Sequence, residues 1–144
     1  MRETKFRGKS KFKNVWHYGS LINNAFFLSS DNSAVPYILD TDDIDYDNFV
    51  DIAEQLDDFE LIPESVGQYT NLKDKNGKEI YEGDILQVGE EYCGTYSPTY
   101  VTFEDGSFRH QISHMHNPVV LNNAKVMVLE VIGNIYENPE MLRE

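Results

Sequence analysis

The sequence has very little cysteine and no long apolar run. Its one cysteine, Cys93, has no second cysteine to pair with, so an internal disulfide is excluded. Glu90 and Glu91 lie close by and disfavour the thiolate, so we expect no reactive thiol. No apolar stretch near the N-terminus is long enough for a signal peptide or a membrane span. We therefore expect a cytoplasmic protein that does not enter a membrane.

Positive charge is missing from a long part of the chain. No lysine or arginine occurs from Asn14 to Leu72, whereas six of the twelve basic residues lie in the first thirteen positions. Residues 40–60 hold ten of the 25 acidic residues, and the formal net charge is −13. This segregation fits a solvated acidic face with a basic strand or arm. It also fits a charge match within or between subunits, a cation site, or an acidic decoy that resembles a phosphate backbone.

Recognisable catalytic patterns are lacking as well. The sequence contains no Gly-rich phosphate loop and no Gly-x-Ser-x-Gly elbow. Carboxylates are so numerous that any acid–base pair chosen from them would be arbitrary. We therefore predict a protein that is not an enzyme, with no catalytic residues and no cofactor.

Short strands joined by tight turns predict the fold. Asn76-Gly77 supplies two residues that tolerate positive φ, as a type I′ turn needs, between strands at Val66–Leu72 and Lys78–Tyr81. Asp105-Gly106 predicts a second tight hairpin, between Tyr100–Phe103 and Phe108–Ile112. Alternation and β-branched residues predict further strands at Val15–Ile22, Tyr37–Leu39, Ile85–Val88 and Lys125–Ile132. The last of these has apolar residues on both faces, which predicts a central strand.

These elements predict a mainly β (α+β) fold, a small bent antiparallel sheet or barrel built from hairpins. A chain of 144 residues has the length of one domain. We expect a single domain over residues 1–144, with N-terminal strands in 1–39, an acidic segment with a short helix in 40–61, and a hairpin core in 62–139.

The acidic segment contains the predicted helix and a pattern that resembles a calcium loop. Phe49, Ile52, Ala53 and Leu56 have helical spacing. Asp43 to Glu54 matches a twelve-residue calcium loop in its alternating acids and its final glutamate. Against calcium, Asn48 replaces the turn glycine and Pro36 would break an incoming helix. We predict a solvated, capped helix start and no metal ligands, with calcium binding by Asp43 to Glu54 as the alternative.

Three histidines lie close together further along the chain. His110, His114 and His116 would share one strand face, and clustered imidazoles can hold zinc or nickel. No cysteine is close in sequence, and Asn117-Pro118 ends the segment. We therefore predict structural roles for these histidines.

The basic N-terminal segment is the part that could contact a polyanion. Aromatic residues can stack on bases, but a nucleic-acid surface also needs a positive groove, and cations are scarce outside residues 1–13. We expect instead that Met1–Lys13 docks against an acidic surface of the same or a neighbouring subunit, with Phe6 buried and its neighbouring cations outward. Docking on a neighbour would favour a homo-oligomer.

Two separated motifs resemble a known family. The run from Val66 to Leu86 and the C-terminal Val131-Ile-Gly-Asn-Ile-Tyr-Glu-Asn-Pro139 are similar to signatures of the YopX family of bacteriophage and prophage proteins. Met1–Arg7 and Trp16–Ile22 resemble the opening strands of that family, although Gly8-Lys9-Ser10 stands where Ala-Trp-Asp is common. The resemblance implies a phage or prophage origin and supplies no biochemical activity.

Composition and resemblance together favour a non-enzymatic accessory protein that binds a protein partner or assembles with itself. The alternatives are a modulator of nucleic-acid metabolism, acting through the basic arm or as an acidic decoy, and an enzyme of a type that the motifs do not identify.

Overall fold

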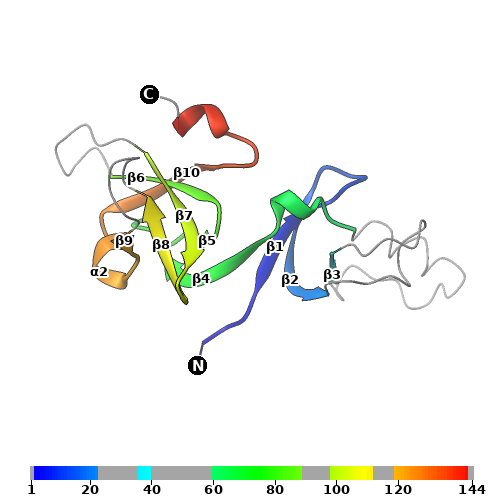
Figure 1. Cartoon of the computed structure of the whole chain (residues 1–144), viewed down its shortest axis with the longest axis horizontal. Coiled ribbons are helices and arrows are strands. Elements are labelled where there is room, and N and C mark those ends of the chain that lie inside the picture. Colours follow the sequence, from blue (N-terminus) through cyan, green and yellow to red (C-terminus); the bar gives the residue numbers. More distant parts are fainter. Residues whose placement is uncertain (1, 23–35, 40–59, 89–97, 112–118, 143–144) are drawn as a thin grey trace, which may run out of the picture. The chain divides into compact units, whose positions relative to one another are not determined.

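The computed structural model describes residues 2–22, 36–39, 60–88, 98–111 and 119–142 (Figure 1). The chain divides into two compact units, Glu3–Gln68 and Met1–Arg2 with Tyr69–Glu144. All strand pairings between the named strands are antiparallel, so the predicted mainly β fold is confirmed. The predicted division at residues 39, 61 and 139 stays a prediction.

The unit Glu3–Gln68 is a small sheet in which β1 and β2 are both interior strands. Its elements are β1 (Phe6–Lys9), β2 (Trp16–Ile22), β3 (Tyr37–Leu39) and the 3₁₀ helix η4 (Pro63–Ser65). Strand β2 pairs with β1 and β3, and β1 also pairs with Gly67 and Gln68. Tyr37, Ile38 and Leu61 are fully buried here. A Cβ on Gly8 would lie 2.5 Å from Leu61 Cδ1, so glycine lets Leu61 pack directly against the β1 backbone.

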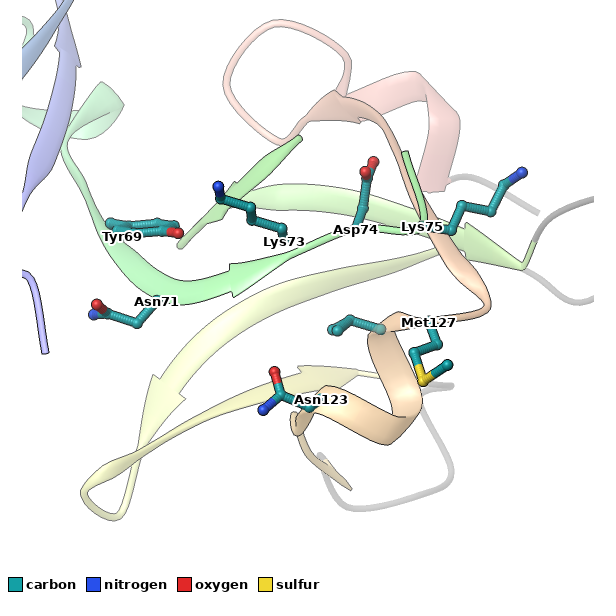
Figure 2. A pocket seen from close by; sticks show the side chains of 8 residues that line it. Tyr69, Asn71, Lys73, Asp74, Lys75, Asn123 and Met127 are labelled. Carbon is teal, nitrogen blue, oxygen red and sulfur yellow. The ribbon is translucent and has the colours of Figure 1, made fainter. Parts of the chain in front are cut away.

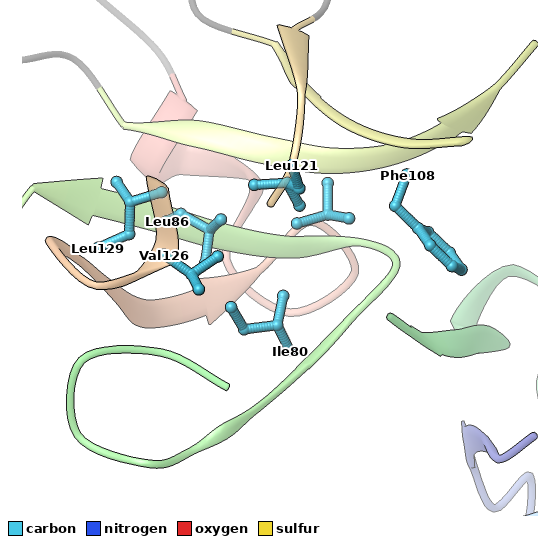
Figure 3. Packing of buried hydrophobic residues seen from close by; sticks show 7 residues of the cluster. Ile80, Leu86, Phe108, Leu121, Val126 and Leu129 are labelled. Atoms are coloured by element: carbon cyan, nitrogen blue, oxygen red, sulfur yellow. The ribbon is translucent and has the colours of Figure 1, made fainter. Parts of the chain in front are cut away.

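The other unit is built on an open five-stranded sheet. Its elements are the main part of β4 (Gly67–Lys73), β5 (Glu79–Tyr81), β6 (Asp84–Val88), β7 (Thr99–Glu104), β8 (Ser107–Gln111), β9 (Val119–Val120), α2 (Asn123–Val126), β10 (Leu129–Asn134) and η6 (Pro139–Leu142). The sheet order is β10-β6-β7-β8-β9. One apolar cluster forms its core (Figure 3): Ile80, Leu86, Val101, Phe108, Leu121, Val126 and Leu129.

The turn between β7 and β8 is the one that the sequence predicts. Glu104 pairs with Ser107, which leaves a two-residue loop of Asp105 and Gly106. Their φ angles are 51° and 77°. The predicted tight hairpin is therefore confirmed, and the two consecutive left-handed residues make its turn type I′.

The turn between β4 and β5 differs from its prediction. Gly77 has φ 82°, but Asn76 is not left-handed. Gly77 N donates to Asp74 O at 3.0 Å, and Asp74 N donates to Lys78 O at 2.8 Å. This is a type I turn followed by a left-handed glycine, so the predicted type I′ turn is wrong. The reason is Asp74, whose Oδ1 accepts from Asn76 N and stabilises the type I geometry.

Replacing Gly77 by valine is expected to lower the free energy of unfolding by about 1 to 3 kcal/mol. A Cβ at Gly77 would meet no atom within 4 Å, so the cost comes from the left-handed backbone alone. Gly77→Asn is the matched control, because asparagine tolerates this conformation better than a β-branched residue. Urea denaturation measures both, and equal losses for the two variants would contradict the explanation.

The segment 125–132 also differs from its prediction. Lys125 and Val126 belong to helix α2, and β10 begins at Leu129. Asn122 caps the helix, since its Oδ1 accepts from Lys125 N at 2.9 Å. In addition, β10 is an outer strand of its sheet, so the predicted central position is wrong.

The predicted helix at residues 49–56 lies outside the described residues. Within the described ranges, none of the helices combines the length and the apolar character that crossing a bilayer requires.

Candidate functional site

Strand β4 carries a bulge that displays Asn71. Tyr69 pairs with Tyr81 and Lys73 with Glu79, so three residues of β4 face one residue of β5 between these pairs. The Thr70 side chain replaces backbone hydrogen bonds that the bulge interrupts. Its Oγ1 donates to Ile80 O at 2.8 Å and accepts from Leu72 N at 3.1 Å. Asn71 takes the left-handed conformation, with φ 65°. Bulges of this kind redirect a side chain away from the regular face of a strand.

A pocket of about 490 Å³ lies beside this bulge (Figure 2). Its lining residues are Tyr69, Asn71, Lys73, Asp74, Lys75, Asn123, Val126 and Met127. Figure 2 shows Asn71 and Lys73 on β4, and Asn123 and Met127 on α2 and the residue after it. Two asparagines, two lysines and a methionine therefore line the same pocket from segments about fifty residues apart in the sequence.

The carboxylate of Asp74 is occupied by the backbone. Its Oδ1 accepts from Asn76 N at 2.8 Å and from Lys78 N at 2.9 Å, and its Oδ2 accepts from Val131 N at 2.9 Å. Such charge-assisted bonds fix the carboxylate against the backbone of the hairpin and of β10. Asp74 therefore forms part of the pocket wall, between the two lysines Lys73 and Lys75 that also line the pocket.

The basic N-terminal segment is arranged differently from its prediction. Arg7 and Lys9 are each 8% exposed, whereas Phe6 is only half-buried. Arg7 Cζ lies 4.9 Å and Lys9 Nζ 5.9 Å from the centroid of the Trp16 ring. The predicted outward position is therefore wrong for Arg7, because β1 is an interior strand and its cations Arg7 and Lys9 pack on an aromatic ring of β2.

The basic N-terminal segment contacts Glu60 of the acidic segment. Lys11 N donates to Glu60 O at 2.9 Å, and Lys11 Nζ lies 3.9 Å from Glu60 Oε1. This contact is within the chain. Strand β1 already has a partner on each side, so its pairing does not require the predicted addition to a neighbour's sheet. Docking against residues 40–59 stays a prediction, because they lie outside the described residues.

Several predicted sites fall in segments other than the described ones. The calcium-like stretch Asp43 to Glu54, Cys93, His114 and His116 all lie outside the described residues. Among the residues that the structure does describe, no group of three or more His, Cys, Asp or Glu side chains could hold a metal ion.

His110 is the described member of the histidine trio. It is buried on β8, with Nδ1 3.4 Å from Thr99 Oγ1. Burial, and secondarily the positive charge of Lys125, lower the pKa of His110 below its ordinary value of 6.5. The imidazole therefore packs as a neutral ring.

Protonation of His110 is expected to destabilise the fold. Because its folded pKa is lowered, its contribution to stability is complete above pH 6.5 and is lost as the pH falls below that value. Melting temperatures at about pH 7.5 and about pH 5.5 test this. The decrease on acidification should be smaller in His110→Gln, and an identical decrease in both proteins would contradict the assignment.

Comparison with known proteins identifies the family. The sequence model of the YopX protein family matches residues 5–143. The chain belongs to the YopX family. The crystal structure of protein EF1440 from Enterococcus faecalis matches this YopX-family chain with TM-score 0.56 and 25% identity, over 98% of this chain and 99% of the other. The crystal structure of yopX from Bacillus subtilis matches with TM-score 0.51 and 21% identity, over 97% and 96% of the two chains, and shows the same fold. None of the curated proteins matches this chain.

The two motifs that resembled the family have structural roles in this YopX-family protein. Asp84 is 1% exposed, and its Oδ2 accepts from Tyr81 N at 2.7 Å. Gly83 O accepts from Ile135 N at 2.8 Å, which joins the first motif to the C-terminal one. The motifs therefore stabilise the turns of the fold.

Sequence reasoning did not find the pocket residues. Met127 lies inside the strand predicted at Lys125–Ile132, Asn123 lies before that strand, and Asn71 lies inside the strand predicted at Val66–Leu72. The available signal was Thr70-Asn71, two residues of strand β4 that readily form local side-chain bonds and, for asparagine, left-handed backbone.

Proposed function

We propose that this YopX-family protein is a non-catalytic accessory protein of a phage or prophage, which binds a protein partner through the pocket beside Asn71. It would act in the cytoplasm of the host cell. The observation that supports the proposal is the pocket itself, a concave site lined by amides, lysines and a thioether.

The chemistry of the lining suits binding. Carboxamides donate and accept hydrogen bonds without changing protonation state, and an exposed methionine adapts its shape to an apolar partner surface. Met127 is 68% exposed. The carboxylate of Asp74 accepts hydrogen bonds from three backbone N–H groups. A partner that covers Met127 and the two asparagines would bury both apolar and hydrogen-bonding surface.

Site-directed photo-crosslinking tests this function. A photoreactive amino acid placed at Met127 should give a discrete crosslinked protein in host cells, whereas the same amino acid at Glu104, an exposed residue that does not line the pocket, should not. A crosslink to a second copy of the chain would identify the partner as itself. Identical products from both positions, or none from Met127, would refute a partner at this pocket.

A second candidate function is the modulation of nucleic-acid metabolism through the tip of the β1–β2 hairpin. The favouring observation is the pair of exposed lysines, Lys11 and Lys13, on either side of Phe12, which is 60% exposed. Cations beside an exposed aromatic ring can contact phosphates and stack on a base. Gel-shift assays with single-stranded DNA at low salt should then show binding that is lost in a Lys11→Gln, Lys13→Gln double variant. Equal shifts in both proteins, or none in the parent, would reject this function.

A further inference from the structure

We infer that the pocket beside Asn71 recognises a carboxylate carried on a peptide, next to an apolar residue of that peptide. This inference rests on the proposed function, because it names the chemistry of the protein partner at the same site. The carboxylate could be an Asp or Glu side chain or the C-terminus of the partner, and the experiment below distinguishes these sources.

Charge is the first step of the argument. Two lysines and one aspartate line the pocket, so its formal charge is +1 on a chain whose total is −13. The Asp74 carboxylate is further compensated by its three N–H donors. An acidic ligand is therefore attracted at this place and repelled over much of the remaining surface, which gives both affinity and position.

The carboxamides supply the second step. Asn71 and Asn123 come from different elements on either side of the pocket (Figure 2). Each can donate to a carbonyl or carboxylate oxygen and accept from a backbone N–H. A peptide group beside a carboxylate presents this combination, whereas an isolated inorganic anion presents acceptors alone.

The apolar side of the pocket supplies the third step. Val126 is 3% exposed and belongs to the core, while Met127 next to it is 68% exposed. A large apolar side chain of the ligand could cover Met127 and remove its surface from water. The site therefore suits an acidic residue with an apolar neighbour.

The backbone at Asn71 allows a variant that removes the side chain while keeping the fold. Its φ of 65° suits glycine, so Asn71→Gly deletes the carboxamide without straining the bulge. We expect the melting temperature of Asn71→Gly to stay close to that of the parent. This separates a loss of binding from a loss of folding.

Lys73 has a matched control in the same hairpin. Lys73 lines the pocket and Lys78 does not, although both are exposed. Lys73→Gln and Lys78→Gln therefore make the same change in charge, one inside the site and one outside it.

The probes are positional-scanning mixtures of fluorescein-labelled hexapeptides, synthesised both as C-terminal acids and as C-terminal amides. Binding to the full chain is measured by fluorescence anisotropy. We expect mixtures with a fixed Asp or Glu, or with a free C-terminus, to bind about fivefold or more tightly than matched Asn, Gln or amidated mixtures. A preference for fixed Asp or Glu in the amide series identifies a side-chain carboxylate, and a preference confined to the acid series identifies a C-terminus.

The variants then locate the binding. Lys73→Gln should weaken it about tenfold, Asn71→Gly about fivefold, and Lys78→Gln less than about twofold. Equal weakening by Lys73→Gln and Lys78→Gln, or no preference for a carboxylate, would overturn the inference. Neutral peptides that bind tightly and lose affinity in Asn71→Gly would overturn it as well, while leaving the proposed function in place. If the Met127 crosslink also failed, the proposed function itself would fall.

Discussion

Asp74→Ala is expected to lower the free energy of unfolding by about 4 kcal/mol, the largest single effect that we expect. Asp74 is 7% exposed, and its carboxylate accepts from the backbone N–H groups of Asn76, Lys78 and Val131. Alanine leaves these three donors without their acceptor. Because Val131 lies 57 residues further along the chain, the substitution loosens both the hairpin turn and its attachment to β10.

Urea denaturation at neutral pH measures the loss. Asp74→Asn keeps the size of the side chain but removes its charge, and should cost about half as much. Glu104→Ala, at an exposed acidic residue, should change the stability by less than about 0.5 kcal/mol. A loss at Asp74 no larger than that at Glu104 would show that these hydrogen bonds contribute little.

Gly133→Val is expected to cost about 3 kcal/mol, chiefly through crowding. A Cβ at this position would lie 2.6 Å from Asn138 Oδ1 and 3.1 Å from Met141 Sδ. The Asn138 side chain cannot withdraw freely, since its Oδ1 accepts from Asn134 N at 3.2 Å. The β-strand therefore needs glycine here so that the C-terminal turn can pack against it.

A double-mutant cycle tests this cause. Gly133→Ala and Asn138→Ala should each destabilise the protein, and the double variant should lose about 1 kcal/mol less than the sum of the two single losses. Strict additivity in thermal or urea denaturation would mean that crowding against Asn138 is not the reason for glycine at position 133.

The sequence determined those features that depend on neighbouring residues. Asp105-Gly106 forms its type I′ turn because both residues accept positive φ and the flanking strands alternate in the ordinary way. The positions of β2, β3 and β6 and the mainly β class follow from the same short-range patterns. Family membership also came from sequence, because two separated motifs, Val66–Leu86 and Val131–Pro139, are similar to signatures of the family and stand in the same order.

Only the tertiary structure decided features that join distant segments. The turn at Asn76-Gly77 takes another type because Asp74 accepts hydrogen bonds within the turn and from Val131. The cations of β1 are buried because β1 pairs on both sides and its neighbour presents Trp16 to them.

The candidate site depends on distant residues in the same way. Asn71 lies on a bulge in which Thr70 bonds to Ile80, and it lines the same pocket as Asn123, which belongs to a helix capped by Asn122. A periodicity of apolar residues does not predict such an arrangement, because it describes one element at a time. The pocket is lined by the bulge in β4 and by the beginning and end of α2. Side-chain hydrogen bonds of Thr70 and Asn122 shape these two elements, and the fold places them side by side.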